Sequence, residues 1–266
     1  MSRIETVFAN LKAIQKKALI PYITAGDPHP KHTVKLLHTL VKSGADMIEL
    51  GIPFSDPMAD GPVIQRASER ALLHKVGLTK VLAMVAEFRL TDLITPIILM
   101  GYANPIEAMG IENFTKAAKA AGVDGVLTVD YPPEECSDFN ANLNANNIDS
   151  IFLLSPTSDS ARVDLIVNQA TGFLYYVSLK GVTGAANLDV EEVCARVAEI
   201  RTKTNLPIAV GFGVKDALTA KRVAAFADAV VVGSRMVQTI EQSSEENLMI
   251  NVSQLMLELR QAIDTK

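Results

Sequence analysis

The chain has 266 residues, of which 48% are hydrophobic and 21% are charged, and its mean hydropathy is +0.21. This length and composition are sufficient to bury one large core, which excludes a mainly disordered chain. A net charge of −5 without any basic block excludes the charge pattern that is typical of nucleic-acid-binding proteins.

The apolar runs and the cysteines of the sequence bear on the cellular compartment of the protein. No apolar run reaches the roughly 18–20 residues that a membrane span requires. Cys136 and Cys194 have no CxxC spacing and no secretory signal accompanies them, which favours a reducing compartment over a disulfide framework. We therefore expect a soluble cytoplasmic protein in which both cysteines are small packing residues.

Short apolar, β-branched segments alternate with longer amphipathic segments from end to end, which is typical of repeated βα units. Most of these segments are apolar at consecutive positions, as buried parallel strands are. The predicted strands are Ala18–Ile23, Asp46–Leu50, Pro96–Met100, Gly125–Val129, Ser150–Leu154, Phe173–Val177, Pro207–Val210 and Ala229–Val232. Eight such units predict an α/β fold of the (β/α)8, or TIM-barrel, type.

The segments between these strands have the apolar spacing of helices. They are Lys31–Lys42, Val63–Leu73, Thr79–Phe88, Ile111–Ala121, Glu134–Asn146, Ser160–Gln169, Val190–Lys203 and Asp216–Ala225. Two extra helices are expected at the ends, Ser2–Lys16 and Glu245–Ala262. Because no Ser/Gly/Pro-rich linker interrupts the series, we expect one barrel domain over residues 1–266.

Three of the predicted strands begin in a similar way, with an aspartate before the apolar run. These residues are Asp46, Asp124 and Asp228. An aspartate at the amino end of a barrel strand is usually structural. We therefore predict no catalytic role for the three.

Glu49 is a carboxylate within an otherwise apolar predicted strand. If Ile48 and Leu50 face the helices, strand alternation points Glu49 into the barrel. One explanation is a structural ion pair with a lysine of a neighbouring strand. The other is general acid–base catalysis, because removal from water raises the pKa of a carboxylate toward the range useful for proton transfer.

Asp60 follows Glu49 at the end of a segment that Pro53 and Pro57 stiffen. By itself an Asp-Gly pair usually forms only a turn. The active sites of barrels are built from the loops after the strands, so this long loop can bring a second carboxylate to the substrate that Glu49 reaches.

A phosphate site is predicted near the end of the chain. Gly211-Phe212-Gly213 follows the seventh predicted strand and Gly233-Ser234 follows the eighth, each before a helix. Barrels often hold a phosphate between these two loops, because glycine lets the backbone approach and a helix start offers N–H donors. Glycines that serve only as tight turns would explain either loop alone.

The segment after the sixth predicted strand, Ser178–Asn187, has the small and hydroxyl-bearing composition of a mobile lid, although flexibility alone would explain it. Lys180 raises another possibility, a Schiff-base lysine of the kind that class I aldolases use. We rank it below the carboxylate pair, because Lys180 lies in a glycine-containing loop rather than in an apolar strand that would desolvate it.

The histidines give no pattern typical of a zinc site. His29 and His32 are three residues apart, while His38 and His74 lie on or just after predicted helices, so the spacing supplies no convergent ligands. We expect all four histidines at the surface and no metal site.

One long motif carries a family resemblance. Pro53–Gln65, with Glu49-Leu50-Gly51 before it and Gly181-Val182-Thr183-Gly184 after the sixth predicted strand, closely resembles the tryptophan synthase α chain family. The match extends over nearly the whole chain, since Met100–Pro105, Gly211–Gly213 and Gly233-Ser234 follow in the expected order.

The resemblance implies a carbon–carbon lyase of tryptophan biosynthesis that splits indole-3-glycerol phosphate into indole and glyceraldehyde 3-phosphate. It implies that Glu49 moves the protons and that Asp60 accepts the indole N–H, with Thr183 orienting Asp60. The implied phosphate ligands are Gly184, Gly213, Gly233 and Ser234, and the implied indole contacts are Tyr22, Met100, Tyr175 and Phe212.

The resemblance also implies a partner, the β subunit of an αββα heterotetramer, which receives the indole. Asp56, Pro57 and Asn104 would meet that partner. The pyridoxal phosphate of such an assembly belongs to the β subunit, so no cofactor is expected in this chain. One difference from the family is Leu179-Lys180, where the family usually has an arginine after the serine, and it changes the cation that could anchor this loop.

Two other functions stay open at this point. One is a different phosphosugar barrel enzyme with a Schiff base on Lys180. The other is a non-catalytic barrel that only binds and activates a partner. Glu49 and Asp60 argue against the second, because a scaffold has no physical reason to keep a carboxylate in an apolar strand.

Overall fold

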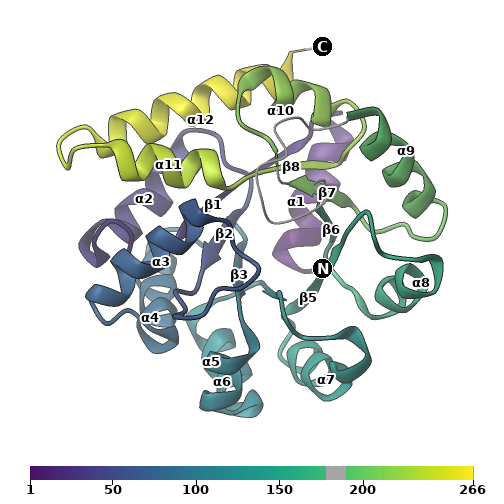
Figure 1. Cartoon of the computed structure of the whole chain (residues 1–266), viewed down its shortest axis with the longest axis horizontal. Helices are drawn as coiled ribbons and strands as arrows, with labels where there is room; N and C mark the ends of the chain where they lie inside the picture. The colour runs from purple at the N-terminus through teal and green to yellow at the C-terminus, as the bar shows by residue number, and fades with distance from the viewer. Residues whose placement is uncertain (178–189, 212, 266) are drawn as a thin grey trace.

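The computed structural model describes residues 1–177, 190–211 and 213–265. In this part of the chain the strands are parallel and pair in chain order, and β8 pairs with β1 to close a barrel (Figure 1). The predicted (β/α)8 barrel is therefore confirmed. The strands are β1 (Ala18–Thr24), β2 (Ile48–Gly51), β3 (Ile97–Gly101), β4 (Gly125–Thr128), β5 (Asp149–Leu154), β6 (Leu174–Val177), β7 (Ile208–Gly211) and β8 (Ala229–Val232).

Helices surround the barrel (Figure 1). They are α2 (Pro30–Lys42), α3 (Pro62–Leu73), α4 (Leu78–Arg89), α5 (Ala103–Met109), α6 (Ile111–Ala121), α7 (Ser137–Ala145), α8 (Ser160–Gln169), α9 (Val190–Arg201), α10 (Ala217–Ala224), α11 (Ser234–Gln242) and α12 (Leu248–Asp264). Their apolar faces and the outward side chains of the strands form the largest core cluster.

Two helices of the structure, α5 and α11, were not among the predicted helices. The helix predicted over Glu134–Asn146 is divided into the short 3-10 helix η1 (Pro133–Glu135) and α7. α5 has only 7 residues and buries only Ile106, so it has no repeated apolar face from which to predict it. α11 buries Met236, Val237 and Ile240, a spacing that does predict a helix.

The helix α1 (Arg3–Ala13) closes the amino end of the barrel. Ser2 and Glu5 form a capping box at its start, and Ile4, Phe8 and Leu11 pack into the cluster inside the strands. The Ser2 hydroxyl donates to Asp149 at the start of β5, at 2.8 Å. Because α1 covers the amino end of the barrel, the accessible mouth lies at the carboxyl ends of the strands.

The three aspartates at the amino ends of strands are structural, as predicted. Each carboxylate accepts a hydrogen bond from a backbone N–H of the adjacent strand and binds an arginine. Asp46 binds Leu19 N and Arg260 at 2.8 Å each, Asp124 binds Ile97 N at 2.8 Å and Arg89 at 2.6 Å, and Asp228 binds Ile208 N and Arg201 at 2.9 Å each. These contacts hold neighbouring strands together at the end of the barrel away from its mouth.

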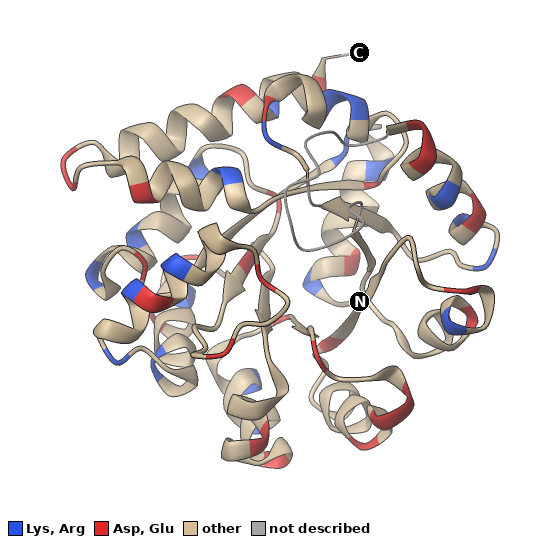
Figure 2. Ribbon diagram, viewed as in Figure 1, with Lys and Arg blue, Asp and Glu red and all other residues tan. Residues whose placement is uncertain are grey.

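Charged residues of both signs are interspersed over the outer helices rather than gathered on one face (Figure 2). This distribution agrees with the lack of a basic block in the sequence. Over the described ranges, none of the helices is both long enough and apolar enough to cross a bilayer.

Candidate active site

A cavity of about 630 Å³ opens at the carboxyl ends of the strands. Residues from strands and from the following loops line it together. They include Tyr22 of β1, Glu49 of β2, Met100 of β3 and Tyr175 of β6, with Asp60, Gly213, Gly233 and Ser234 from the loops and helix starts. The fold therefore brings most of the predicted site residues to one place.

Glu49 faces this cavity, as strand alternation predicted, while Ile48 and Leu50 pack in the outer core. Its side chain is 0% exposed, and neither carboxylate oxygen has a hydrogen-bond partner among the described residues. No described lysine of a neighbouring strand therefore pairs with it. Burial without a compensating partner raises the pKa of Glu49 to about 8.

Asp60 lies in the turn before α3, where its N–H donates to Pro57 O at 3.0 Å. The Tyr102 hydroxyl donates a hydrogen bond to Asp60 Oδ2 at 3.1 Å. Burial raises the pKa of Asp60 to about 6, and the bond from Tyr102 acts in the opposite direction.

The two carboxyl groups thus differ in their ionisation at neutral pH. With a pKa of about 8, Glu49 is mainly protonated, and with a pKa of about 6, Asp60 is mainly ionised. One cavity is therefore lined by a proton donor and by a negative charge, which are the two groups that acid–base chemistry near neutral pH requires.

Tyr102 is a site residue that the sequence reasoning missed. It follows β3 directly, is 3% exposed, and its hydroxyl also accepts the Ala59 N–H at 3.1 Å. Its ring stacks on Phe54, with centroids 5.2 Å apart. Asp130, in the loop after β4, accepts a hydrogen bond at 2.7 Å from the N–H of Ala103, the residue after Tyr102. This bond connects the segments that follow β3 and β4. Its position at the end of a barrel strand is the signal that could have identified Tyr102.

The apolar side of the cavity extends beyond the predicted residues. Tyr22 and Tyr175 are buried, and Met100 is half-buried. Further lining residues that the sequence did not indicate are Ile64, Thr128, Val129, Tyr131, Phe152, Leu153 and Val177. These side chains extend the lining of the cavity beyond the predicted residues.

The starts of two glycine-containing segments also line the cavity. Gly213 has φ +78°, a conformation that favours glycine, and Gly233 stands at the N-cap of α11. Ser234 is the first residue of that helix and is exposed. The free N–H groups of a helix start and its dipole favour an anion here.

The segment Ser178–Asn187, which the sequence argument compared with a lid, lies outside the described residues, and so do the candidate residues Lys180, Thr183, Gly184 and Phe212. The roles assigned to the last three stay predictions, as does the effect of Leu179-Lys180. The described residues already contain both carboxylates and the two glycines, Gly213 and Gly233, that line the same cavity.

Known proteins resemble this chain over its whole length. A family model described as tryptophan synthase alpha chain matches residues 8–264. The chain belongs to the tryptophan synthase α chain family. It is 60% identical to the tryptophan synthase alpha chain of Cupriavidus metallidurans over 264 residues, which cover 99% of this chain and 100% of that one. The same protein of Chromobacterium violaceum is also 60% identical, over 263 residues.

Solved structures agree with this tryptophan synthase α chain assignment. The tryptophan synthase subunit alpha of Legionella pneumophila superposes with a TM-score of 0.92 at 47% identity, covering 99% of both chains. A Mycobacterium tuberculosis tryptophan synthase structure gives 0.91 at 33% identity. The resemblance inferred from the sequence motifs is confirmed.

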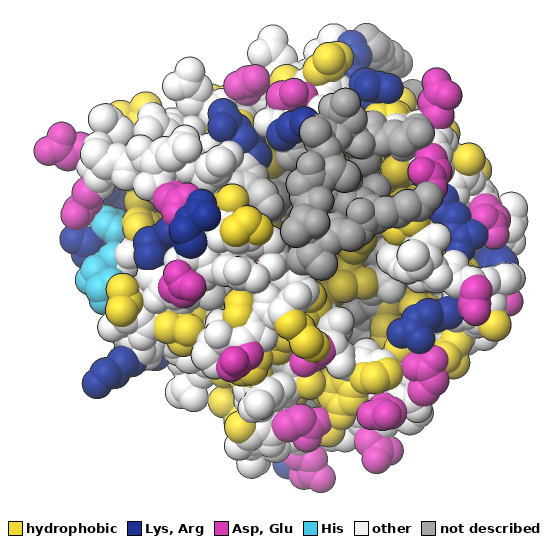
Figure 3. All heavy atoms as spheres, in the orientation of Figure 1, with side chains coloured by type: hydrophobic (Ala, Val, Ile, Leu, Met, Phe, Trp, Pro, Cys, Tyr) yellow, Lys and Arg dark blue, Asp and Glu magenta, His cyan; other side chains and the backbone are white. Residues whose placement is uncertain are grey.

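The residues expected to meet a partner of a tryptophan synthase α chain lie in the segments that follow β2 and β3. Asp56 and Asn104 are exposed, Pro57 is half-buried, and Met58 beside them is 72% exposed. Figure 3 looks onto this face and shows hydrophobic side chains among acidic ones near its centre. A role in partner binding stays a prediction.

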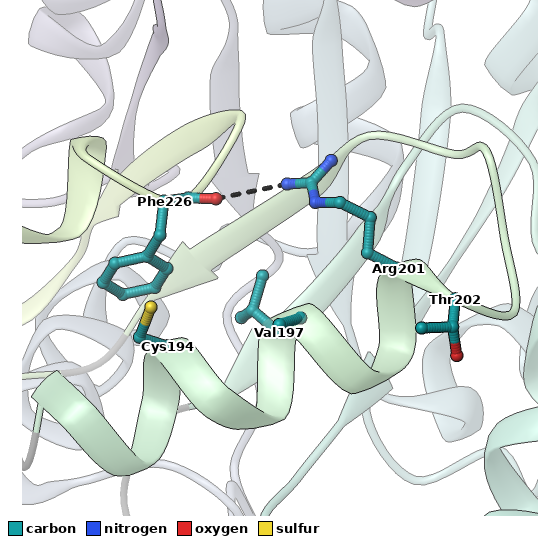
Figure 4. Close-up of a pocket in the computed structure, with 6 residues that line it drawn as sticks. Cys194, Val197, Arg201, Thr202 and Phe226 are labelled. Atoms are coloured by element: carbon teal, nitrogen blue, oxygen red, sulfur yellow. Dashed lines mark hydrogen bonds between the residues drawn. The ribbon is translucent and has the colours of Figure 1, made fainter.

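A second hollow, of about 360 Å³, lies on the outside of the barrel and is lined mainly by α9 and Phe226 (Figure 4). Arg201 donates to Phe226 O at 3.2 Å and binds Asp228. Cys194 lines it and is exposed, so the expected buried packing is wrong for Cys194, although it is right for Cys136. The preceding residue, Val193, is buried on the inward face of α9, so Cys194 lies on the exposed side of the helix.

The histidines differ in two ways from expectation. His74 is exposed, but His29, His32 and His38 are half-buried. The fold also brings three of them together, with ring centroids 4.3 Å apart for His29 and His74 and 6.3 Å for His29 and His32. Within the described ranges, no group of three or more His, Cys, Asp or Glu side chains has a metal-binding arrangement.

Proposed function

We propose that Glu49 and Asp60 carry out, in this chain, the reaction of the tryptophan synthase α family. That reaction is the cleavage of indole-3-glycerol phosphate to indole and glyceraldehyde 3-phosphate in tryptophan biosynthesis. The observation that supports these roles is the convergence of a buried, unpartnered Glu49 and a half-buried Asp60 on one cavity.

The first step is protonation of the indole ring. Glu49, protonated at neutral pH, delivers its proton to C3 of the indole, and the ring becomes a cationic indolenine. Asp60 accepts the ring N–H and stabilises the positive charge that appears there. A carboxylate in a partly desolvated site is effective in this role because charges interact more strongly when water is excluded.

The second step breaks the carbon–carbon bond. The Glu49 carboxylate formed in the first step removes the proton from the hydroxyl on the carbon attached to C3. The oxygen forms a carbonyl, the electrons of the broken bond return to the ring, and indole and the aldehyde leave. Glu49 is then protonated again, so its high pKa serves both steps.

The remaining residues bind the two ends of the substrate. Gly213, Gly233 and Ser234 form the proposed phosphate end, supported by the start of α11. Tyr22, Met100 and Tyr175 form the proposed indole wall. We propose the same phosphate role for Gly184, an indole contact for Phe212, and the orientation of Asp60 for Thr183, all from the family resemblance.

We further propose that the chain works without its own cofactor, since proton transfer by Glu49 and charge stabilisation by Asp60 account for both steps. The proposed partner is a pyridoxal-phosphate β subunit in an αββα heterotetramer, and the proposed location is the cytoplasm. Exposed Asp56 and Asn104 beside Pro57 support a contact at the mouth. Co-elution with a β subunit, weakened by Asp56→Arg, would test that contact.

The proposed reaction is tested by incubating the purified chain with indole-3-glycerol phosphate in D₂O. We expect equal amounts of indole and glyceraldehyde 3-phosphate, and indole that carries deuterium at C3 because Glu49 exchanges its proton with solvent. If no indole forms, with or without a β subunit, the proposal is wrong.

A further inference from the structure

The helices α3 and α11 lie side by side at the mouth of the barrel, and their starts reach two different parts of the proposed site (Figure 1). α3 begins two residues after Asp60, and the side chain of Gln65 near its start donates to Asp60 O at 2.8 Å. α11 begins with Ser234, at the proposed phosphate end. The spacing of these two helices therefore sets the distance between the carboxylate and the phosphate end.

Close to the cavity, the two helices are joined by apolar contacts. Ile64 and Ala67 of α3 pack with Val237 of α11. The Tyr22 ring of β1 completes this small cluster. Apolar burial stabilises the contact but is not directional, so these residues alone do not fix how the helices are aligned.

Directional contacts lie further along the two helices, in an ion-pair cluster. Glu241 of α11 accepts two hydrogen bonds from Arg66 of α3, at 2.8 Å each, and one from Arg70 at 2.6 Å. Arg70 also donates to both carboxylate oxygens of Asp27, at 2.6 and 3.0 Å. Asp27 follows β1 and is only 1% exposed. Three segments that are distant in the sequence thus meet in one cluster of two carboxylates and two guanidinium groups.

The chemistry of this cluster gives it a defined geometry. Bonds between arginine and a carboxylate in which both oxygens take part are strong and fix the orientation of both groups. The hydrogen bonds from Arg66 and Arg70 lower the pKa of Glu241 to about 2, so Glu241 stays ionised over the pH range of an enzyme assay. Arg70 and Glu241 are only 26% and 23% exposed, which limits the competition from water.

The helices carry this constraint to the site. At a rise of about 1.5 Å per residue, Glu241 lies roughly 10 Å along α11 from Ser234. Helices of two or three turns behave as rigid elements. The position of Glu241 relative to Arg70 therefore determines the position of Ser234 relative to Asp60.

We propose that Arg70 and Glu241 are positioning residues, which join α3 to α11 and fix the spacing between Asp60 and the phosphate end. This inference rests on the proposed function, and it adds to it the contacts that let one substrate molecule reach both ends at once. Neither residue is among those that line the cavity, so both act through the groups that the two helices carry. Such residues should matter for a substrate that spans the site and not for its separate halves.

The test compares the wild-type chain with Glu241→Leu and Arg70→Met. It measures kcat/KM for indole-3-glycerol phosphate and, by calorimetry, the separate Kd values of indole and of glycerol 3-phosphate. We expect kcat/KM to fall by roughly 10- to 100-fold in both variants, while each Kd stays within about twofold of wild type. Glu241→Leu leaves the pair of Asp27 and Arg70 in place, so it carries the test if Arg70→Met does not fold.

The matched control is Arg260→Met. Arg260 is 16% exposed and binds Asp46 at 2.8 Å and Asp264 at 2.6 Å, but at the amino ends of the strands. This variant should lose stability and keep the kcat/KM of the folded chain. An unchanged kcat/KM in Glu241→Leu would contradict the inference, as would a loss of indole and glycerol 3-phosphate binding in proportion to the loss of kcat/KM, and both would leave the proposed function in place. Absence of indole release by the wild-type chain would remove the inference and the proposed function together.

Discussion

The Tyr102 hydroxyl accepts the Ala59 N–H and donates to Asp60 Oδ2, each at 3.1 Å. A residue at the end of β3 thereby fixes a carboxylate in the loop after β2. Together with the backbone bond from Asp60 N to Pro57 O and the bond from Gln65 Nε2 to Asp60 O, this hydroxyl holds Asp60 in a defined orientation at the cavity.

Replacement of Tyr102 by Phe should therefore reduce activity without loss of the fold. A hydrogen bond to a charged group contributes about 1.5–3 kcal/mol, which corresponds to a loss of kcat/KM of roughly 10- to 100-fold. Steady-state kinetics would measure this loss against the control Tyr176→Phe, which removes a hydroxyl from a buried ring of the outer core, away from the cavity. A variant with wild-type kcat/KM would show that the contact does not position Asp60.

The two carboxyl groups predict a bell-shaped pH dependence of kcat. Activity should fall below pH 6, where Asp60 gains a proton, and above pH 8, where Glu49 loses the proton that it must donate. Initial rates of indole release over the pH range would show both limbs. Activity that keeps rising well above the pKa of Glu49 would contradict its role as the acid.

Glu49 should also make the stability of the protein depend on pH. Its pKa is raised from 4.5 to about 8 by folding, so the unfolded chain binds fewer protons between these values and stability is lost as the pH rises through them. Glu49→Gln should therefore be more stable than wild type near pH 8.5, by on the order of a few kcal/mol, and similar near pH 4. Urea unfolding at the two pH values measures the difference in free energy of unfolding between Glu49→Gln and wild type. A difference that does not change with pH would argue against a buried, uncompensated carboxyl group.

Asp124 should contribute to the stability of the protein but not to catalysis. It binds Arg3 at 2.7 Å and Arg89 at 2.6 Å at the end of the barrel away from the mouth, and Arg89 is only 8% exposed. Asp124→Asn should lower the free energy of unfolding by about 3 kcal/mol, because it removes the nearer of the two carboxylates beside the buried Arg89 guanidinium and leaves only Asp92, at 3.9 Å. The kcat of the folded fraction should not change, and a selective loss of kcat would assign Asp124 a functional role.

A Schiff base on Lys180 should not form. If the two carboxyl groups perform the chemistry, borohydride added during turnover leaves no covalent adduct, and the mass of the intact protein stays unchanged. An adduct located on Lys180 by peptide mapping would replace the carboxylate mechanism with that of a class I aldolase.

The sequence was sufficient for the features that depend on local pattern. Apolar runs located the strands, and alternation around Glu49 gave the direction of its side chain. Features that depend on contacts between distant segments could not be predicted. The bond from Tyr102 to Asp60 forms only when the loop after β2 folds over the end of β3. The rings of His29 and His74 come together only because the fold places the start of α2 beside the end of α3.

The most direct test of the account is a comparison of Glu49→Gln and Asp60→Asn with the wild-type chain in indole release and in binding of indole-3-glycerol phosphate by calorimetry. The account predicts that Glu49→Gln lowers kcat by at least about 10³-fold while binding stays within a few-fold of wild type, and that Asp60→Asn also loses most of its activity. A Glu49→Gln variant that binds the substrate and still releases indole at a rate close to wild type would contradict the central claim.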